Sequence, residues 1–214
     1  MKKLPSRLNE LTQWFLRENV LVDVGCDHGW LPIVSLQNGW VSSAIAVDRA
    51  VEPLNLAVKH GKGVSGLQFI LSDGLDNVDV PMGTVVNIAG MGGAQMRSIL
   101  SRSPLSRIQR IVLQPNRDAH LVREYLASMG WYTKAASVVE ERGRFFLSWC
   151  AEQKKGDMGA NRWHWEESWF EQHPSASWKK WLKHRHVQIQ RVEEKHGLSL
   201  SLKEEKNALK RLGF

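Results

Sequence analysis

Residues 19–29 read Asn-Val-Leu-Val-Asp-Val-Gly-Cys-Asp-His-Gly, and this stretch decides the fold. The mostly apolar, β-branched run at 20–24 predicts a buried strand, and Gly25 and Gly29 bracket a tight turn. The segment that follows opens on Leu31-Pro32, and proline is common in the first turn of a helix. A strand, a glycine turn and a helix in this order predict a site where backbone amides meet a nucleotide-like ligand.

The alternation of strands and helices continues along the chain. Apolar runs predict further strands at 43–47, 67–71, 84–88 and 110–113. Helical spacing predicts helices at 8–16, 31–36, 52–59, 94–101 and 120–129, the first with Ser6 as its N-cap. The segments 131–140 and 144–151 predict an antiparallel hairpin around Arg142-Gly143. Alternating βα units predict an α/β fold with a parallel sheet covered on both faces. The added hairpin is typical of the Rossmann-like class I methyltransferase sheet.

Composition bounds the class of protein. Hydrophobic residues make up 43% of the 214 residues and charged residues 24%, which suits a globular core with a small appendage. No run has the length of a membrane span, and the first residues lack an apolar signal core, so we expect a cytoplasmic protein without membrane contact. The only cysteines, Cys26 and Cys150, argue against a disulfide framework and against a zinc cluster, and we expect no metal.

The charge is concentrated in the C-terminal part. Residues 1–153, the predicted cofactor domain, carry 16 basic and 14 acidic residues, whereas residues 154–214 carry 13 and 8. This basic extension predicts a polyanionic partner such as RNA or DNA, although a solvated helical surface remains an alternative. Its tryptophans are Trp163, Trp165, Trp169, Trp178 and Trp181. A heptad-like seam of Trp178, Leu182, Ile189 and Val192, interrupted by Arg185, and a second apolar pair at Leu202 and Leu209 after Gly197 predict a short antiparallel helix pair.

Acidic residues at the strand ends select the cofactor. Asp48 ends the second strand, where a carboxylate can accept both ribose hydroxyls, and Asp73 ends the third, where it can accept a bond from an adenine amine. Both acids suit NAD and S-adenosylmethionine alike. Asp27, however, occupies the middle-glycine position of a dinucleotide fingerprint, where a carboxylate repels pyrophosphate and attracts an ammonium or sulfonium. We therefore favour S-adenosylmethionine over NAD.

Two later loops point to the reacting centre. The fourth strand ends in Gly90-Met91-Gly92-Gly93 and the fifth in Gln114-Pro115-Asn116, and such loops face the ligand crevice of an open α/β sheet. The glycines leave space for a flat base, and Asn116 offers a donor and an acceptor that suit the N6–N1 edge of adenine. Singly, Asp48 can be a strand-end cap, Asp73 a turn residue and the glycines a plain connection. Their joint occurrence favours a site.

The motifs D-V-G-C-D-H-G, A-V-D, S-D-G-L, I-A-G-M-G-G and L-Q-P-N, in this order, resemble the bacterial tRNA (adenine-N1)-methyltransferases that modify adenosine 22. The similarity covers about residues 5–151 and includes Ser6-Arg7-Leu8 and Gly143-Arg144-Phe145-Phe146. The resemblance implies attack of adenine N1 on the cofactor methyl group, without a strong general base. It also implies tRNA as the partner and a helical C-terminal extension. Other RNA or DNA base methylation, or a non-catalytic cofactor- and RNA-binding module, remain alternatives.

The candidate site residues follow from these motifs. As catalytic residues we assign Asn116, Asp27 and Gly90. The cofactor residues are Gly25, Cys26, Asp27, His28, Gly29, Asp48, Asp73, Gly74, Ala89 and Gly90. The substrate residues are Arg7, Met91, Gly92, Gly93, Gln114, Pro115, Asn116, Lys179, Lys180 and Lys183. We further expect phosphate contacts from Arg185 and Arg191, apolar walls for an extruded base at Trp30 and Met91, and a monomeric protein.

Overall fold

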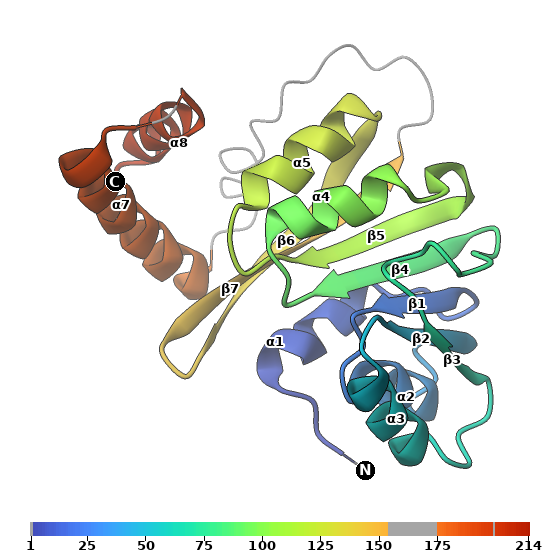
Figure 1. Ribbon diagram of the computed structural model, residues 1–214. Helices are drawn as coiled ribbons and strands as arrows, with labels where there is room; N and C mark the ends of the chain where they lie inside the picture. Colours follow the sequence, from blue (N-terminus) through green and yellow to red (C-terminus); the bar gives the residue numbers. More distant parts are fainter. Residues whose placement is uncertain (1, 154–174, 199) are drawn as a thin grey trace.

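Seven strands form one sheet in the order β3-β2-β1-β4-β5-β7-β6 (Figure 1). The computed structural model describes residues 2–153, 175–198 and 200–214. The strands are β1 Val20–Val24, β2 Ser43–Asp48, β3 Leu67–Leu71, β4 Thr84–Ala89, β5 Ile108–Gln114, β6 Trp131–Glu141 and β7 Arg144–Gln153. The helices are α1 Ser6–Asn9, α2 Trp30–Gln37, α3 Val51–His60, α4 Gly93–Ser101, α5 Ala119–Ser128, α7 Ala176–His196 and α8 Leu200–Arg211. The predicted Rossmann-like sheet is confirmed, because β1 to β5 pair in parallel and β7 is antiparallel to both β5 and β6.

Neighbouring residues of each central strand enter different layers of the core. In β4, Val85 belongs to a cluster with residues of α2 and the N-terminal segment, whereas Val86 belongs to a cluster with residues of α4 and α5. Side chains alternate across a strand, so an apolar run buries both faces of the sheet. Helices α2 and α3 thus cover one face, and α4 and α5 the other (Figure 1).

The order of the strands reverses between β1 and β4. From β1 the chain moves outward to β2 and β3, and from β4 it moves the other way to β5. In open α/β sheets the crevice at the carboxyl ends of the two strands beside such a reversal binds the ligand. The glycine turn after β1 and the loop after β4 both begin at this point.

The N-terminal segment differs from the single helix predicted at 8–16. It consists of the short α1 and a 3₁₀ helix at Glu10–Trp14, and Pro5 rather than Ser6 is the N-cap. The buried side chains of Leu11 and Trp14 are three residues apart, which suits the 3₁₀ repeat of three residues per turn. The segment therefore presents its apolar residues to the sheet through a tighter helix.

The described part of the C-terminal extension contains α7 and α8, which contact each other, and α7 also contacts β6. Trp178, Leu182 and Ile189 of the predicted seam are buried, but Val192 is 36% exposed, so its place in the seam was wrong. The predicted break at Gly197 is confirmed, with φ at 70°. The expected tryptophans Trp163, Trp165 and Trp169 lie outside the described residues.

Candidate active site

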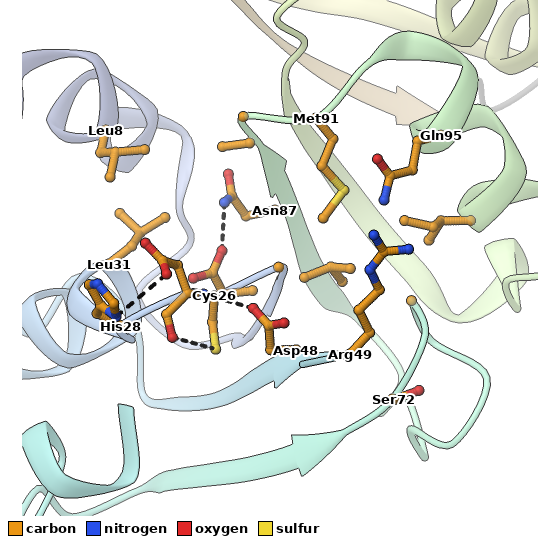
Figure 2. Close-up of a pocket in the computed structure, with 18 of the residues that line it drawn as sticks. Leu8, Cys26, His28, Leu31, Asp48, Arg49, Ser72, Asn87, Met91 and Gln95 are labelled. Carbon is orange, nitrogen blue, oxygen red and sulfur yellow. Dashed lines mark hydrogen bonds and ion pairs between the residues drawn. The ribbon is translucent and has the colours of Figure 1, made fainter. Parts of the chain in front are cut away.

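A cavity of about 450 Å³ lies at the reversal point between β1 and β4. Figure 2 shows Asp48 and Arg49 at the end of β2, with Asn87 of β4 above them in this view and Met91 and Gln95 above Arg49. All ten residues predicted to bind the cofactor lie in or directly beside this cavity; the lining ones are Gly25, Cys26, Asp27, His28, Asp48, Asp73, Gly74, Ala89 and Gly90. We call it the cofactor pocket.

The glycine turn has little room for side chains. Gly25 has a φ of 75°, and a Cβ there would lie 2.2 Å from Cε of Met91. Gly29 has a φ of 72°, and its Cβ would lie 2.8 Å from that of Ala57 in α3. Because Gly25 has no side chain, Met91 can pack over the turn, and because Gly29 has none, α2 can begin close to α3. Met91, predicted to meet the substrate, thus reaches the cofactor side of the loop as well.

Asp48 supports the turn from the neighbouring strand. Its Oδ2 accepts a hydrogen bond from the backbone N–H of Asp27 at 3.0 Å, and its Oδ1 accepts one from that of Ala50 at 2.9 Å. Each carboxylate oxygen can accept a second bond, so both remain able to receive a ribose hydroxyl. Asp27 itself has a φ of 51°, and its exposed carboxylate lies 3.5 Å from Nδ1 of His28. The turn therefore holds an acidic side chain at the pocket mouth.

Asp23 and Asn87 are pocket residues that were not among the predicted site residues. Asn87 donates from Nδ2 to Oδ1 of Asp23 at 2.7 Å, and both side chains are buried. Burial, with a smaller contribution from the charge of Asp48, raises the pKa of Asp23 to about 7 against the lowering effect of this hydrogen bond. The signals were present in the sequence: an acid two residues before Gly25, and a lone polar residue inside the apolar run of β4.

The side chains that line the pocket suit a cationic ligand. Four carboxylates, those of Asp23, Asp27, Asp48 and Asp73, line it against two guanidinium groups. Oδ1 of Asn87 is buried and has no hydrogen-bond partner among the described residues, so it can accept from an ammonium group. Burial, assisted by the nearby carboxylates, raises the pKa of the Cys26 thiol well above its ordinary value. Cys26 is thus a neutral packing residue.

The loops after β4 and β5 are joined by hydrogen bonds between their backbones. Gly90 donates to the carbonyl of Gln114 at 3.0 Å, Asn116 to that of Met91 at 2.8 Å, and Gly93 to that of Arg117 at 2.8 Å. The side chain of Asn116 also donates from Nδ2 to the carbonyl of Gly90 at 2.6 Å. The two predicted reacting motifs therefore form one unit. A Cβ at Gly93 would lie 1.9 Å from the carbonyl oxygen of Asp118, so only glycine allows this approach.

Of the predicted substrate residues Gln114 and Pro115, only Pro115 lines a cavity, which lies beside the cofactor pocket, whereas Gln114 lines neither. Both are buried, and Gln114 donates from Nε2 to the carbonyl of Arg7 at 2.8 Å and to Oγ of Ser148 at 2.9 Å. Its Oε1 accepts from Nη1 of Arg7 at 3.3 Å. Both ends of the Gln114 amide are therefore hydrogen-bonded to other residues of the protein, and these bonds connect the N-terminal segment to the sheet. Arg7 is held where it faces the pocket, with its guanidinium over the ring of Phe146.

The basic residues expected on the extension have different surroundings. Lys179, Lys183 and Arg191 are exposed on α7. Lys180 forms an ion pair with Glu140 at 3.0 Å, and Arg185 binds Glu205 through two hydrogen bonds of 2.6 and 2.9 Å. These two side chains therefore also hold α7 against the hairpin and against α8. Trp30, suggested as a base wall, instead stacks on His60 at the rim of the cofactor pocket.

Within residues 2–153, 175–198 and 200–214, no group of three or more histidine, cysteine or acidic side chains is arranged to hold a metal ion. In that same part of the chain no helix combines the length and apolarity needed to cross a membrane.

Comparison with known proteins relates this geometry to a chemistry. Residues 4–147 match the model of a methyltransferase domain. The tRNA (adenine(22)-N(1))-methyltransferase of Bacillus subtilis (strain 168) is 32% identical over 164 residues, which are 74% of this chain and 68% of that protein. The solved structure of the B. subtilis m1A22 tRNA methyltransferase TrmK superposes with a TM-score of 0.78 at 25% identity, over 98% of each chain. That of Streptococcus pneumoniae Sp1610 in complex with S-adenosyl-L-methionine gives 0.80 at 27%, over 98% of this chain and 99% of that one.

Proposed function

The chain belongs to the methyltransferase family that includes the B. subtilis tRNA (adenine(22)-N(1))-methyltransferase, and on that premise we propose that it methylates N1 of adenosine 22 in tRNA. Its cofactor is S-adenosylmethionine. We further propose that it acts as a monomer in the cytoplasm, where its substrate is found.

The observation that carries this proposal is the joined pair of loops at the edge of the acidic pocket. Gly90 lines the cofactor pocket, and its carbonyl is bonded to the side chain of Asn116. Oδ1 of Asn116 and the carbonyl of Gly90 are two acceptors next to each other, and the N6 amine of adenine offers two donors. In adenine, N1 is bonded to the carbon that carries this amine, so a base held by its amine at this point also presents N1 to this part of the site.

The proposed chemistry asks for positioning more than for proton transfer. S-adenosylmethionine supplies a methyl group on a sulfonium, which is electrophilic without further activation. Adenine N1 carries a free lone pair at neutral pH, so the chain has to orient the base and exclude water. The methylated base becomes a cation, and we assign the exposed carboxylate of Asp27 to stabilise that charge. Asp48 and Asp73 would hold the ribose and adenine of the cofactor.

Analysis of the product nucleoside tests the reaction class. Purified protein is incubated with an unmodified tRNA transcript and S-adenosylmethionine labelled in the methyl group, and the RNA is digested to nucleosides. We expect the label in 1-methyladenosine. Label in N6-methyladenosine or in another base would contradict the proposed orientation of adenine, and no incorporation would contradict catalysis on tRNA.

A further inference from the structure

A second cavity, of about 1020 Å³, adjoins the cofactor pocket. We call it the outer cleft. Its walls are the loop after β5, the start of α5, the N-terminal end of β7 and one face of α7. Figure 1 shows α7 beside the end of the β6–β7 hairpin, where these walls come together. The outer cleft is as large as the largest pockets for small molecules, so it suits a more extended ligand.

The outer cleft begins where the cofactor pocket ends. Arg7 and Gly90 line both cavities, and Asn116 lines the outer cleft. A ligand in the outer cleft therefore lies next to the loop pair that we assign to the reacting base. The two cavities together give a route from the surface to the reacting centre.

The two cavities carry opposite charge. Five arginines line the outer cleft, against the carboxylates of Asp118 and Glu205. Glu205 is engaged by Arg185, and Asp118 lies 3.8 Å from Arg117, whose side chain remains 81% exposed. Arg144 is exposed and forms no ion pair with any residue that the structure describes. The outer cleft thus has an excess of positive charge, whereas the cofactor pocket is acidic.

Aromatic side chains accompany these charges. Phe145 and Trp181 are half-buried in the wall of the outer cleft, and the ring of Phe145 lies 5.4 Å from that of His184. Basic grooves interleaved with aromatic rings bind single-stranded nucleic acid, because phosphates meet the cations and bases stack on the rings.

We propose that the outer cleft binds the ribose–phosphate backbone of the RNA strand next to the target adenosine, with Arg117 and Arg144 contacting its phosphates. The proposal rests on the proposed function, since it concerns the substrate of that same site. An adenine that leaves its stack can reach Gly90 while the neighbouring nucleotides stay in the outer cleft. The exposed lysines of α7 do not line this cleft, so phosphate recognition shifts from them to the loop after β5 and the hairpin.

Two charge-matched double variants test the proposal. One is Arg117→Ala with Arg144→Ala. The control is Lys59→Ala with Lys62→Ala, which also removes two exposed cations but lies at the β3 edge, opposite β6 in the strand order. Affinity for an unmodified tRNA transcript is measured between 50 and 200 mM salt, with calorimetry of S-adenosylmethionine in parallel.

We expect the arginine variant to bind tRNA about 10-fold more weakly or worse, and its log–log salt dependence to be shallower by roughly 1.5. Cofactor affinity should stay unchanged, and the lysine control should stay within about twofold of wild type. An arginine variant that binds tRNA as well as the lysine control would overturn the proposal, even if the wild type methylates tRNA. A wild type that methylates no tRNA would overturn the proposed function instead, while a selective loss of tRNA affinity in the arginine variant would still support the outer cleft.

Discussion

Asn116 connects two loops through two different groups. Its side-chain amide donates to the carbonyl of Gly90, and its backbone amide donates to the carbonyl of Met91. Only one of the two amide hydrogens is needed for the first bond, and Oδ1 stays available as an acceptor. The residue can thus fix the loop and contact the base at once. This double use is the reason why we propose the exposed Asn116 as a residue of the reacting centre.

Asn116→Ala should reduce the single-turnover methylation rate by about 10²-fold, because one positioned hydrogen-bonding group beside the reacting atoms is lost. The affinity for S-adenosylmethionine should change little, since Asn116 does not line the cofactor pocket. Rapid-quench kinetics and calorimetry measure the two effects. Asn55→Ala, at an exposed asparagine of α3, is the matched control. Equal rates in the two variants would remove Asn116 from the catalytic set.

The raised pKa of the buried Asp23 predicts that both the stability of the protein and its affinity for the cofactor depend on pH. Its pKa is about 7 in the folded protein against 3.8 ordinarily. The stability that Asp23 contributes is therefore fully present below about pH 4 and is lost as the pH rises through 7. A cationic cofactor favours the carboxylate, so its affinity should rise over the upper part of the same interval.

Melting temperatures of the ligand-free protein and calorimetric titrations between pH 6 and 8 check both trends. S-adenosylhomocysteine, which lacks the sulfonium charge, should show the weaker pH dependence. Asp23→Asn should flatten both curves. If that variant keeps the wild-type pH dependence, another group is responsible.

At the scale of the elements, the loops after β4 and β5 act as one because Gly93 allows their backbones to meet. Gly93→Ala places a methyl group 1.9 Å from a carbonyl oxygen. We therefore expect the free energy of unfolding to fall by about 2 kcal/mol or more, and the methylation activity to fall as well. Chemical denaturation measures the loss. Gly63→Ala is the comparison: Gly63 has open space around it but a positive φ, unlike Gly93, so its substitution should cost only the backbone strain of about 1–2 kcal/mol. A Gly93→Ala variant as stable as the wild-type protein would show that the contact with Asp118 does not restrict this position.

Gln114 links the N-terminal segment to β5 and β7. Gln114→Leu leaves the carbonyl of Arg7 and the hydroxyl of Ser148 without this partner, which should cost about 1–3 kcal/mol in the free energy of unfolding. Since Arg7 would lose its bonds to Gln114 and keep its contacts with Glu141 and Phe146, the methylation rate should fall while cofactor affinity is largely kept. Denaturation and steady-state kinetics test this. A variant with lost stability and wild-type turnover would leave Gln114 a purely structural role.

The sequence predicted the sheet because the central strands are short apolar runs, and β1, β2 and β4 end at a glycine or an acid. It predicted Asp27, Asp48 and Gly90 because their positions at strand ends are fixed by local order. It misplaced Gln114, whose partners Arg7 and Ser148 are 107 and 34 residues away. Contacts of that kind depend on the tertiary arrangement and leave no local pattern. The 3₁₀ turn near Trp14 was missed for a related reason, since spacings of three and four residues are similar in a short segment.

At the scale of the whole molecule, charge is divided between two adjoining cavities. The chain has a formal net charge of +7, yet the cofactor pocket carries four carboxylates against two arginines, whereas the outer cleft carries five arginines against two carboxylates. In the function that we propose, this division attracts a cationic cofactor and a polyanionic substrate to different sides of Gly90. The loop pair of Gly90 and Asn116 lies between them, where a methyl group can pass from one ligand to the other.

Position mapping of methylated tRNA tests this account most directly. An unmodified transcript is incubated with the purified protein and S-adenosylmethionine and then copied by reverse transcriptase, which stops at a base methylated on N1. The account predicts a single stop at adenosine 22, which disappears when that adenosine is replaced by guanosine. Stops at several adenosines, or none in a transcript that the protein binds, would contradict it.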